Sequence, residues 1–316
     1  MKRLMRSDHD TPMTPNRIHQ VSDTAFMAAA YRAMESQRKH ALFHDPLAAK
    51  LAGTRGQQIV ASLPKKAFVG GWTVVIRTTV IDALIQAAVA EGVDTILNLG
   101  AGLDSRPYRL TLPSTLHWIE ADLPHVIDLK QEQLSGETPC CQLTRVGLDL
   151  ANVDARRTFL CDVVAQSRKV LVLTEAVIPY LSQDQVASLA MDLRSHAVVK
   201  YWLVDYFSPA SYAYRRRSGM SQAMKQAPFL FEPQDYFGFF RQTGWQPRET
   251  RYFAIEAQRL GRPAPFPWPI KLITSIAGLM ASPERRMEMK RYAGFTLFEP
   301  ATSDSETTSS GQHEAP

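Results

Sequence analysis

Short apolar runs alternate with amphipathic stretches along the middle of this 316-residue sequence. This alternation predicts βαβ units and a mainly parallel sheet, as in α/β proteins. We expect strands at 95–99, 117–121, 145–148, 170–173 and 202–206, and a late strand at 294–299. The late strand follows a long helical connection, so it can insert antiparallel at the end of the sheet.

Helices are predicted between these strands, at 124–134, after Ser182 and at 233–243. Ser182 and Gln185 have the spacing of a capping box, in which each side chain binds the other residue's backbone N–H. Gly244 follows the third of these helices and is a suitable C′ residue. The pattern thus predicts helix boundaries as well as helix positions.

The stretch 72–91 has the periodicity of an amphipathic helix. Its apolar stripe consists of Val74, Ile81, Leu84, Ile85 and Ala88. Arg77 lies on the same stripe, and a buried guanidinium is unfavourable unless an anion pairs with it. Arg77 is therefore either an anion-binding residue or a side chain that reaches past the helix edge to solvent.

The cysteines and the apolar segments argue against a metal-binding, secreted or membrane-spanning protein. Cys140, Cys141 and Cys161 have no metal-ligand spacing, and we expect no metal site and a reducing, cytoplasmic location. The first residues lack the apolar core of a signal peptide. The apolar run 270–281 contains a lysine and is shorter than the roughly 20 residues that cross a bilayer.

The net charge is +5, but the basic residues are scattered apart from one cluster at 215–217. A nucleic-acid surface would show a basic stripe with interleaved aromatics, so we expect neither a nucleic-acid nor a membrane partner. Residues 1–20 are expected to be flexible, and the Ser/Thr-rich tail 301–316 to be disordered. The folded domain is expected to span 21–300.

Gly100-Ala101-Gly102 directly follows the first buried strand, where open α/β sheets bind ligands. Two glycines allow a sharp turn and close approach of a ligand to the backbone, although an ordinary tight turn has the same pattern. Glu120 and Asp122 end the second strand, at the expected position of a ribose-binding acid. We favour Asp122, because it is the last residue before the turn. A capping role is the alternative.

Asp104 and Ser105 argue against a dinucleotide. Ser105 stands where a GxGxxG motif has its third glycine, and Asp104 would repel a pyrophosphate. A carboxylate can instead accept hydrogen bonds from an ammonium group. The chemistry favours adenosine with a cationic, phosphate-free tail, which describes S-adenosylmethionine.

Two further strand ends carry acids. Asp149 and Leu150 could bind the exocyclic amine and the face of an adenine, although Asp149 alone is also a suitable helix N-cap. Glu175 follows the fourth strand and would face the sulfonium or amino-acid end of the cofactor. Arg77 would suit the cofactor's carboxylate.

Several blocks resemble the leucine carboxyl methyltransferase family: NLGAGLDSR at 98–106, EADLP at 120–124, and TEA at 174–176. Residues 22–25, 44–46 and 76–78 agree in the same order, so the resemblance covers roughly 20–300. It implies a Rossmann-like, seven-stranded class I methyltransferase sheet. It also implies a helical lid, which we place at about 21–70, 207–232 and 255–292.

The resemblance also assigns roles to residues of this chain. Arg77 would bind the cofactor carboxylate, Gly100 its methionine part and Asp122 its ribose. Asp149 and Leu150 would hold the adenine, and Glu175 would line the cofactor site. Where eukaryotic members have a Lys-Arg pair, this chain offers only Arg32.

The expected reaction is O-methylation of a carboxylate on a small molecule. An ionised carboxylate needs no base, and no histidine stands at a convincing position, so the catalytic residue is not identified. Tyr206, Tyr212 and Arg215 are substrate candidates. Methylation of a hydroxyl is the alternative within the fold. A nicotinamide-dependent oxidoreductase and a non-catalytic binding protein are alternatives of other classes. The sequence does not indicate an oligomeric state.

Overall fold

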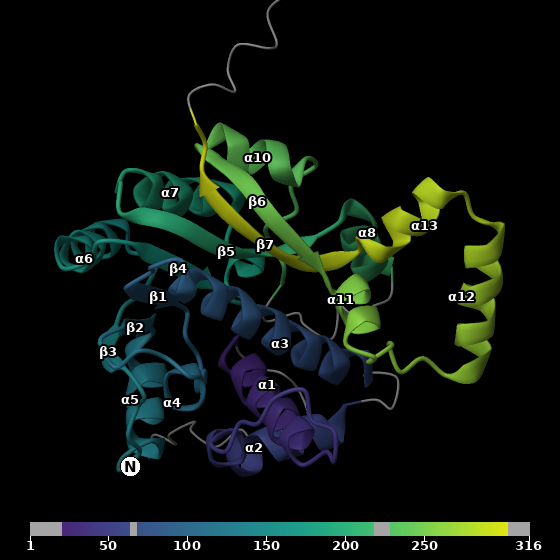
Figure 1. The fold of residues 1–316 in the computed structure, drawn as a ribbon, viewed down its shortest axis with the longest axis horizontal. Coiled ribbons are helices and arrows are strands. Elements are labelled where there is room, and N and C mark those ends of the chain that lie inside the picture. Colours follow the sequence, from purple (N-terminus) through teal and green to yellow (C-terminus); the bar gives the residue numbers. More distant parts are fainter. Residues whose placement is uncertain (1–20, 64–67, 218–227, 303–316) are drawn as a thin grey trace, which may run out of the picture.

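The computed structural model describes residues 21–63, 68–217 and 228–302. They form a seven-stranded sheet in the order β3-β2-β1-β4-β5-β7-β6 (Figure 1). The strands are β1 Thr95–Leu99, β2 His117–Asp122, β3 Gln142–Gly147, β4 Val170–Thr174, β5 Val199–Phe207, β6 Trp245–Tyr252 and β7 Ala293–Pro300. β1 to β5 are parallel, and β7 is antiparallel to both β5 and β6. The predicted seven-stranded α/β sheet with a late antiparallel strand is confirmed.

Strand β6 was missed by the sequence pattern. It is an edge strand that pairs with β7, so only one of its sides takes part in the ladder. It contains Pro247, Arg248 and Glu249, and the register shifts between Pro247 and Glu249. Proline, charges and a bulge are tolerated at an edge but interrupt the alternation that predicts strands. Strand β3 begins three residues earlier than expected, at Gln142.

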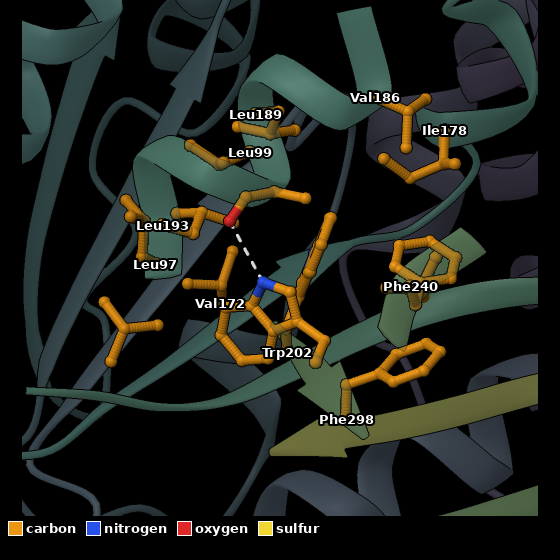
Figure 2. Close-up of a cluster of buried hydrophobic side chains, with 14 of the residues drawn as sticks. Leu97, Leu99, Val172, Ile178, Val186, Leu189, Leu193, Trp202, Phe240 and Phe298 are labelled. Atoms are coloured by element: carbon orange, nitrogen blue, oxygen red, sulfur yellow. Dashed lines mark hydrogen bonds between the residues drawn. The ribbon is translucent and has the colours of Figure 1, made fainter. Parts of the chain in front are cut away.

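Helices cover both faces of the sheet, and the others lie around its edges (Figure 1). They are α1 Val21–Ser36, α2 Ala48–Ser62, α3 Phe68–Ala90, α4 Arg106–Arg109, α5 Pro124–Gln133, α6 Val153–Ala165, α7 Gln183–Arg194, α8 Pro209–Arg217, α10 Tyr236–Gln242, α11 Phe253–Arg259, α12 Trp268–Met280 and α13 Pro283–Lys290, with a 3-10 turn η2 at Ile178–Tyr180. Helices α6, α7 and α10 bury one core against the strands. Figure 2 shows part of it, with Trp202 of β5 beside Phe240 and Phe298.

Helix α3 packs on the opposite face of the sheet with α11. All five residues of its predicted stripe are buried, from Val74 to Ala88. Its segment Val69–Ala90 is the one helix of the described chain that is long and apolar enough to cross a membrane. Since the stripe packs against Ile96, Leu171 and Leu203, α3 is a core helix of this fold.

The helix ends confirm part of the capping prediction. Ser182 and Gln185 form the predicted capping box at the start of α7. Gly244 has the expected positive φ of 83°, although α10 begins only at Tyr236, after its N-cap Asp235. Asn152, and not Asp149, caps α6. The predicted flexible segment 1–20 and all but the first two residues of the predicted tail 301–316 lie outside the described residues.

Candidate functional site

The loop after β1 turns on two glycines. Gly100 and Gly102 have φ values of 69° and 46°, in the left-handed region that favours glycine. The Gly100 N–H donates to the carbonyl of Ala121, at 2.7 Å, which fastens the loop to β2. A Cβ on Gly100 would lie 2.3 Å from Cγ2 of Val177, so the backbone angle and the packing both require glycine.

Asp122 lies beside this loop at the tip of β2. One of its oxygens accepts the Gly102 N–H and the other accepts the Leu123 N–H, each at 2.7 Å. A carboxylate has about four lone-pair sites, so this half-buried group retains capacity for hydroxyl donors. Glu120 is fully buried and pairs with Lys130 at 2.7 Å and Arg145 at 2.9 Å. The structure therefore brings Asp122, and not Glu120, to the glycine loop.

Charged side chains meet where β1 and β4 end. Arg106 Nη1 lies 2.7 Å from Asp104 Oδ2 and 2.8 Å from Glu175 Oε2, and Arg77 Nε lies 2.7 Å from Glu175 Oε1. Asn98 also donates to Asp104, at 2.9 Å. Burial opposes ionisation of both acids, but the arginines outweigh it and lower the pKa of Asp104 and of Glu175. Both carboxylates are therefore ionised at neutral pH.

A second group of ion pairs supports this cluster. Asp82 of α3 binds Arg106 at 2.6 Å and Arg109 at 2.7 Å. Asp45 accepts from Ser105 Oγ at 2.6 Å and from Arg32 Nε at 2.8 Å. Helices α3 and α4 and the segment around Asp45 are thus joined to the glycine loop by buried charges.

Arg32 also donates to the carbonyl of Leu103, at 2.6 Å, so its guanidinium holds the loop from the α1 side. Both of these partners belong to the protein, and direct contact of Arg32 with a cofactor stays a prediction. The same holds for Asp104, whose oxygens already accept from Asn98 and Arg106.

A strained turn follows Glu175. Ala176 has a φ of 57°, the one positive value among the described non-glycine residues. Its N–H donates to Asp205 Oδ2, at 2.7 Å, which holds the turn against the end of β5. Asp205 is only 4% exposed, and burial raises its pKa to about 7 despite the opposing charge of Arg77. This buried carboxyl was not recognised from the sequence.

Helix α8, which follows β5, carries aromatic and basic side chains. The Arg215 guanidinium of α8 lies 3.6 Å from the ring centre of Phe229, and Tyr212 is buried on the same helix. Burial raises the pKa of Tyr180, whereas the charges of Arg215 and Arg77 lower it. Arg216 and Arg217 are exposed, and Arg216 pairs with Glu232.

Tyr206 packs in the core, and Asp149 lies in an exposed turn. The Tyr206 ring packs among Tyr236, Phe237 and Tyr252 in the core, which favours a structural role. Asp149 is exposed and accepts the N–H of Ala151 at 2.9 Å, which stabilises the turn after β3. Leu150 is half-buried. Adenine binding by Asp149 and Leu150 remains a prediction.

The site's own atoms fit S-adenosylmethionine. Arg77 Nε is buried and makes no aligned hydrogen bond, although it lies in an ion pair with Glu175. The guanidinium has five N–H groups, so donors other than Nε remain for an incoming carboxylate. Asp122 has lone pairs left for ribose hydroxyls, and the glycine loop presents backbone free of Cβ atoms.

A family model described as leucine carboxyl methyltransferase matches residues 25–193, slightly more than half of the chain. The chain belongs to the leucine carboxyl methyltransferase family. The predicted enzyme class and cofactor, those of S-adenosylmethionine-dependent methyltransferases, are confirmed with it.

Relatives named as candidate S-adenosyl-L-methionine-dependent methyltransferases include proteins of Streptomyces coelicolor and Frankia alni. The first is 31% identical over 179 residues, 52% of this chain and 62% of the relative. The second is 28% identical over 253 residues, 76% of this chain and 87% of the relative.

Two solved structures show weak overall similarity. A DUF574 family protein of Streptomyces avermitilis is 11% identical, with a TM-score of 0.48 over 88% of this chain and 97% of its own. Magnesium protoporphyrin IX methyltransferase of Synechocystis, solved with bound SAH, is 13% identical, with a TM-score of 0.44 over 74% and 88%.

Sequence reasoning assigned no role to several residues of this methyltransferase's site, among them Arg106, Asp82 and Asp205. One signal was available for Arg106. It lies two residues after Asp104, an acid with which it pairs in the structure. Asp82 and Asp205 gave only the weaker signal of an acid within an apolar run.

Proposed function

We propose that this methyltransferase transfers the methyl group of S-adenosylmethionine to a carboxylate oxygen of a small molecule. The observation that supports the acceptor is Arg215, whose guanidinium packs over Phe229 on the helix that also carries the buried Tyr212. Arg215 is half-buried, and a guanidinium can donate two parallel hydrogen bonds to a carboxylate, which suits an anionic acceptor.

The cofactor, when bound, supplies a methyl group already activated by a sulfonium. The protein's task is to align the acceptor and exclude water. The glycine loop and Asp122 would hold the nucleoside, and Arg77 would bind the amino-acid carboxylate. Glu175 and Asp104 would supply negative charge close to the cationic ammonium and sulfonium groups of the cofactor. Arg215 would orient the acceptor, whose ionised carboxylate needs no base.

A hydroxyl acceptor is the second candidate, and one observation favours it. Asp205 is buried at the end of β5, and its pKa is raised to about 7. A carboxyl group with a pKa near the working pH is suited to take a proton from a phenol or an alcohol. Asp205 would then act as the base.

Labelled methyl transfer distinguishes the two candidates. The enzyme is incubated with methyl-labelled S-adenosylmethionine and a panel of carboxylic acids and phenols, and the products are treated with mild base. A methyl ester releases volatile labelled methanol, whereas an ether keeps its label. Label that resists base contradicts the carboxylate proposal.

Arg215→Gln and Arg217→Gln form a matched pair on one helix, since Arg215 is half-buried and Arg217 is exposed. We expect Arg215→Gln to raise KM for the acceptor by about tenfold or more, as for the loss of a hydrogen bond to a charged group. Arg217→Gln should leave KM unchanged. Equal effects would contradict the role of Arg215.

We also propose a cytoplasmic location, because Cys140, Cys141 and Cys161 are all unpaired thiols. Helices α1 and α2, with α8 and the segment from α11 to α13, would form the lid. The contact of Arg32 with the glycine loop supports this assignment for α1, and the position directly after β5 supports it for α8.

A further inference from the structure

Helix α12 exposes large apolar side chains. Trp268, Ile273 and Met280 are 75%, 65% and 84% exposed, and Leu272 and Ile276 are also exposed. Residues 268, 272, 276 and 280 are four positions apart, so they follow one side of the helix. In Figure 1, α12 stands away from the body of the molecule. A contiguous apolar surface of this kind marks an interaction site.

We call the segment around α12, residues 259–291, the arm. It contains seven basic and two acidic residues, so its net charge of +5 equals that of the whole chain. Arg285, Arg286, Lys290 and Arg291 of the arm are exposed. Within the described chain, no carboxylate lies in ion-pair range of these four side chains, whereas most exposed arginines elsewhere have such a partner.

Both ends of the arm are fixed to the fold. At its start, Arg262 binds Glu35 at 3.0 Å, and its carbonyl accepts from Trp72 Nε1 at 2.8 Å. At its end, the Tyr292 carbonyl accepts the Ser208 N–H at 3.0 Å, next to α8. A ligand bound to the arm would therefore hold the enzyme at a defined orientation.

We propose that the arm binds the surface of an anionic lipid bilayer. An exposed apolar stripe supplies the part that enters the headgroup region, and the cations without a carboxylate partner supply attraction to anionic lipids. Trp268 at one end of the stripe is a residue type favoured at membrane interfaces. This inference departs from the sequence-based expectation of no membrane partner, and it is independent of the acceptor proposed above.

A second copy of the chain suits this surface less well. Self-association through the arm would place two segments of charge +5 against each other, and like charges across an interface are repulsive. An anionic bilayer satisfies the apolar stripe and the cations together.

Vesicle sedimentation tests the proposal with the full chain. We expect binding to phosphatidylcholine vesicles that contain 30% phosphatidylserine at low salt, and at least tenfold weaker binding to pure phosphatidylcholine or in 0.5 M salt. Trp268 is the one exposed tryptophan among the five of the chain, all of which lie in the described residues. A blue shift of emission on binding, absent in Trp268→Phe, would locate the contact at α12.

Matched variants separate the arm from the general surface. Ile273→Ser/Met280→Ser and Arg285→Gln/Arg286→Gln should each weaken vesicle binding about tenfold or more. Met34→Ser/Met191→Ser and Arg38→Gln/Arg241→Gln remove exposed groups elsewhere and should not. Circular dichroism checks that all variants fold.

Three results would overturn the proposal. One is no binding to anionic vesicles at low salt, and another is equal loss in the arm variants and their controls. The third is a concentration-dependent dimer in light scattering that Ile273→Ser/Met280→Ser abolishes, since the occupant would then be a second copy. None of these results depends on finding the methyl acceptor.

Discussion

Asp122 combines two tasks in one side chain. It accepts the N–H groups of Gly102 and Leu123, so it shapes the glycine loop before any ligand arrives. The same carboxylate is the expected ribose acceptor. A substitution here therefore acts on the loop and on the ligand together.

We expect Asp122→Ala to weaken binding of S-adenosylhomocysteine at least tenfold, because hydrogen bonds to a charged acceptor contribute about 1.5–3 kcal/mol. It should also lower the stability of the cofactor-free protein by about 1 kcal/mol, since two backbone donors lose their acceptor. Calorimetry and thermal unfolding measure the two effects. Asp128→Ala, on exposed α5 surface, is the control. Unchanged affinity would remove Asp122 from the cofactor site.

The ion pair between Arg77 and Glu175 leads to a different prediction, in which one substitution lowers both stability and cofactor binding. Arg77→Met should lower the free energy of unfolding by about 1–3 kcal/mol, because Glu175 loses one of its two arginines. It should also abolish measurable cofactor binding if Arg77 holds the cofactor carboxylate. Urea unfolding and calorimetry test the two parts.

Asp192 offers a matched control, because it too is shared by two arginines, Arg156 and Arg157. Arg157 is exposed, so Arg157→Met should change stability by no more than about 1 kcal/mol and leave cofactor binding intact. An Arg77→Met variant that binds cofactor normally would show that this pair is purely structural.

At the scale of elements, the glycine loop depends on the turn after β4. Val177 occupies the space that a Gly100 side chain would need. The loop after β1 and the strained turn at Ala176 are therefore packed as one unit, and the Asp205 hydrogen bond to Ala176 supports it from β5.

Gly100→Ala and Gly136→Ala separate packing from backbone strain. Both glycines have positive φ, so each alanine costs roughly 1–2 kcal/mol of backbone strain. Only Gly100→Ala adds an overlap with Val177, because nothing lies within 4 Å of the Gly136 position. We expect Gly100→Ala to lose more stability and to bind cofactor weakly. Val177→Ala in that background should restore part of both. No restoration would mean that strain alone explains the defect.

The elements that could be predicted were those with local signals. β1 matches its apolar run at both ends, and the Ser182 capping box is a pattern of four neighbouring residues. β6 could not be predicted, because its place at the sheet edge permits Pro247 and several charges. The same distinction between local and long-range signals holds for the residues of the candidate site. Gly100 and Asp122 follow strands, whereas the pairing of Arg106 with Glu175 joins residues 69 positions apart.

At the scale of the whole molecule, Asp205 links stability to pH. Its pKa rises from an ordinary value of 3.8 to about 7 on folding, because it is buried. Between these values the unfolded chain has released the proton while the folded chain retains it. The free energy of unfolding therefore falls as pH rises through this window. Above a pH of about 7, the contribution of Asp205 no longer changes with pH. From pH 5 to 7 the loss is on the order of 2–3 kcal/mol.

Asp205→Asn isolates this contribution. Asparagine keeps an oxygen acceptor for the Ala176 N–H but does not titrate, so the stability of the variant relative to wild type should rise between pH 5 and 7 by that amount. Urea unfolding at several pH values measures the difference, in which the opposite contributions of Asp104 and Glu175 cancel. Arg77 lowers the pKa of Asp205, so Arg77→Met should move the window to higher pH. Parallel curves for wild type and Asp205→Asn would show that Asp205 is ionised throughout, and it could then not serve as a base with a pKa near neutrality.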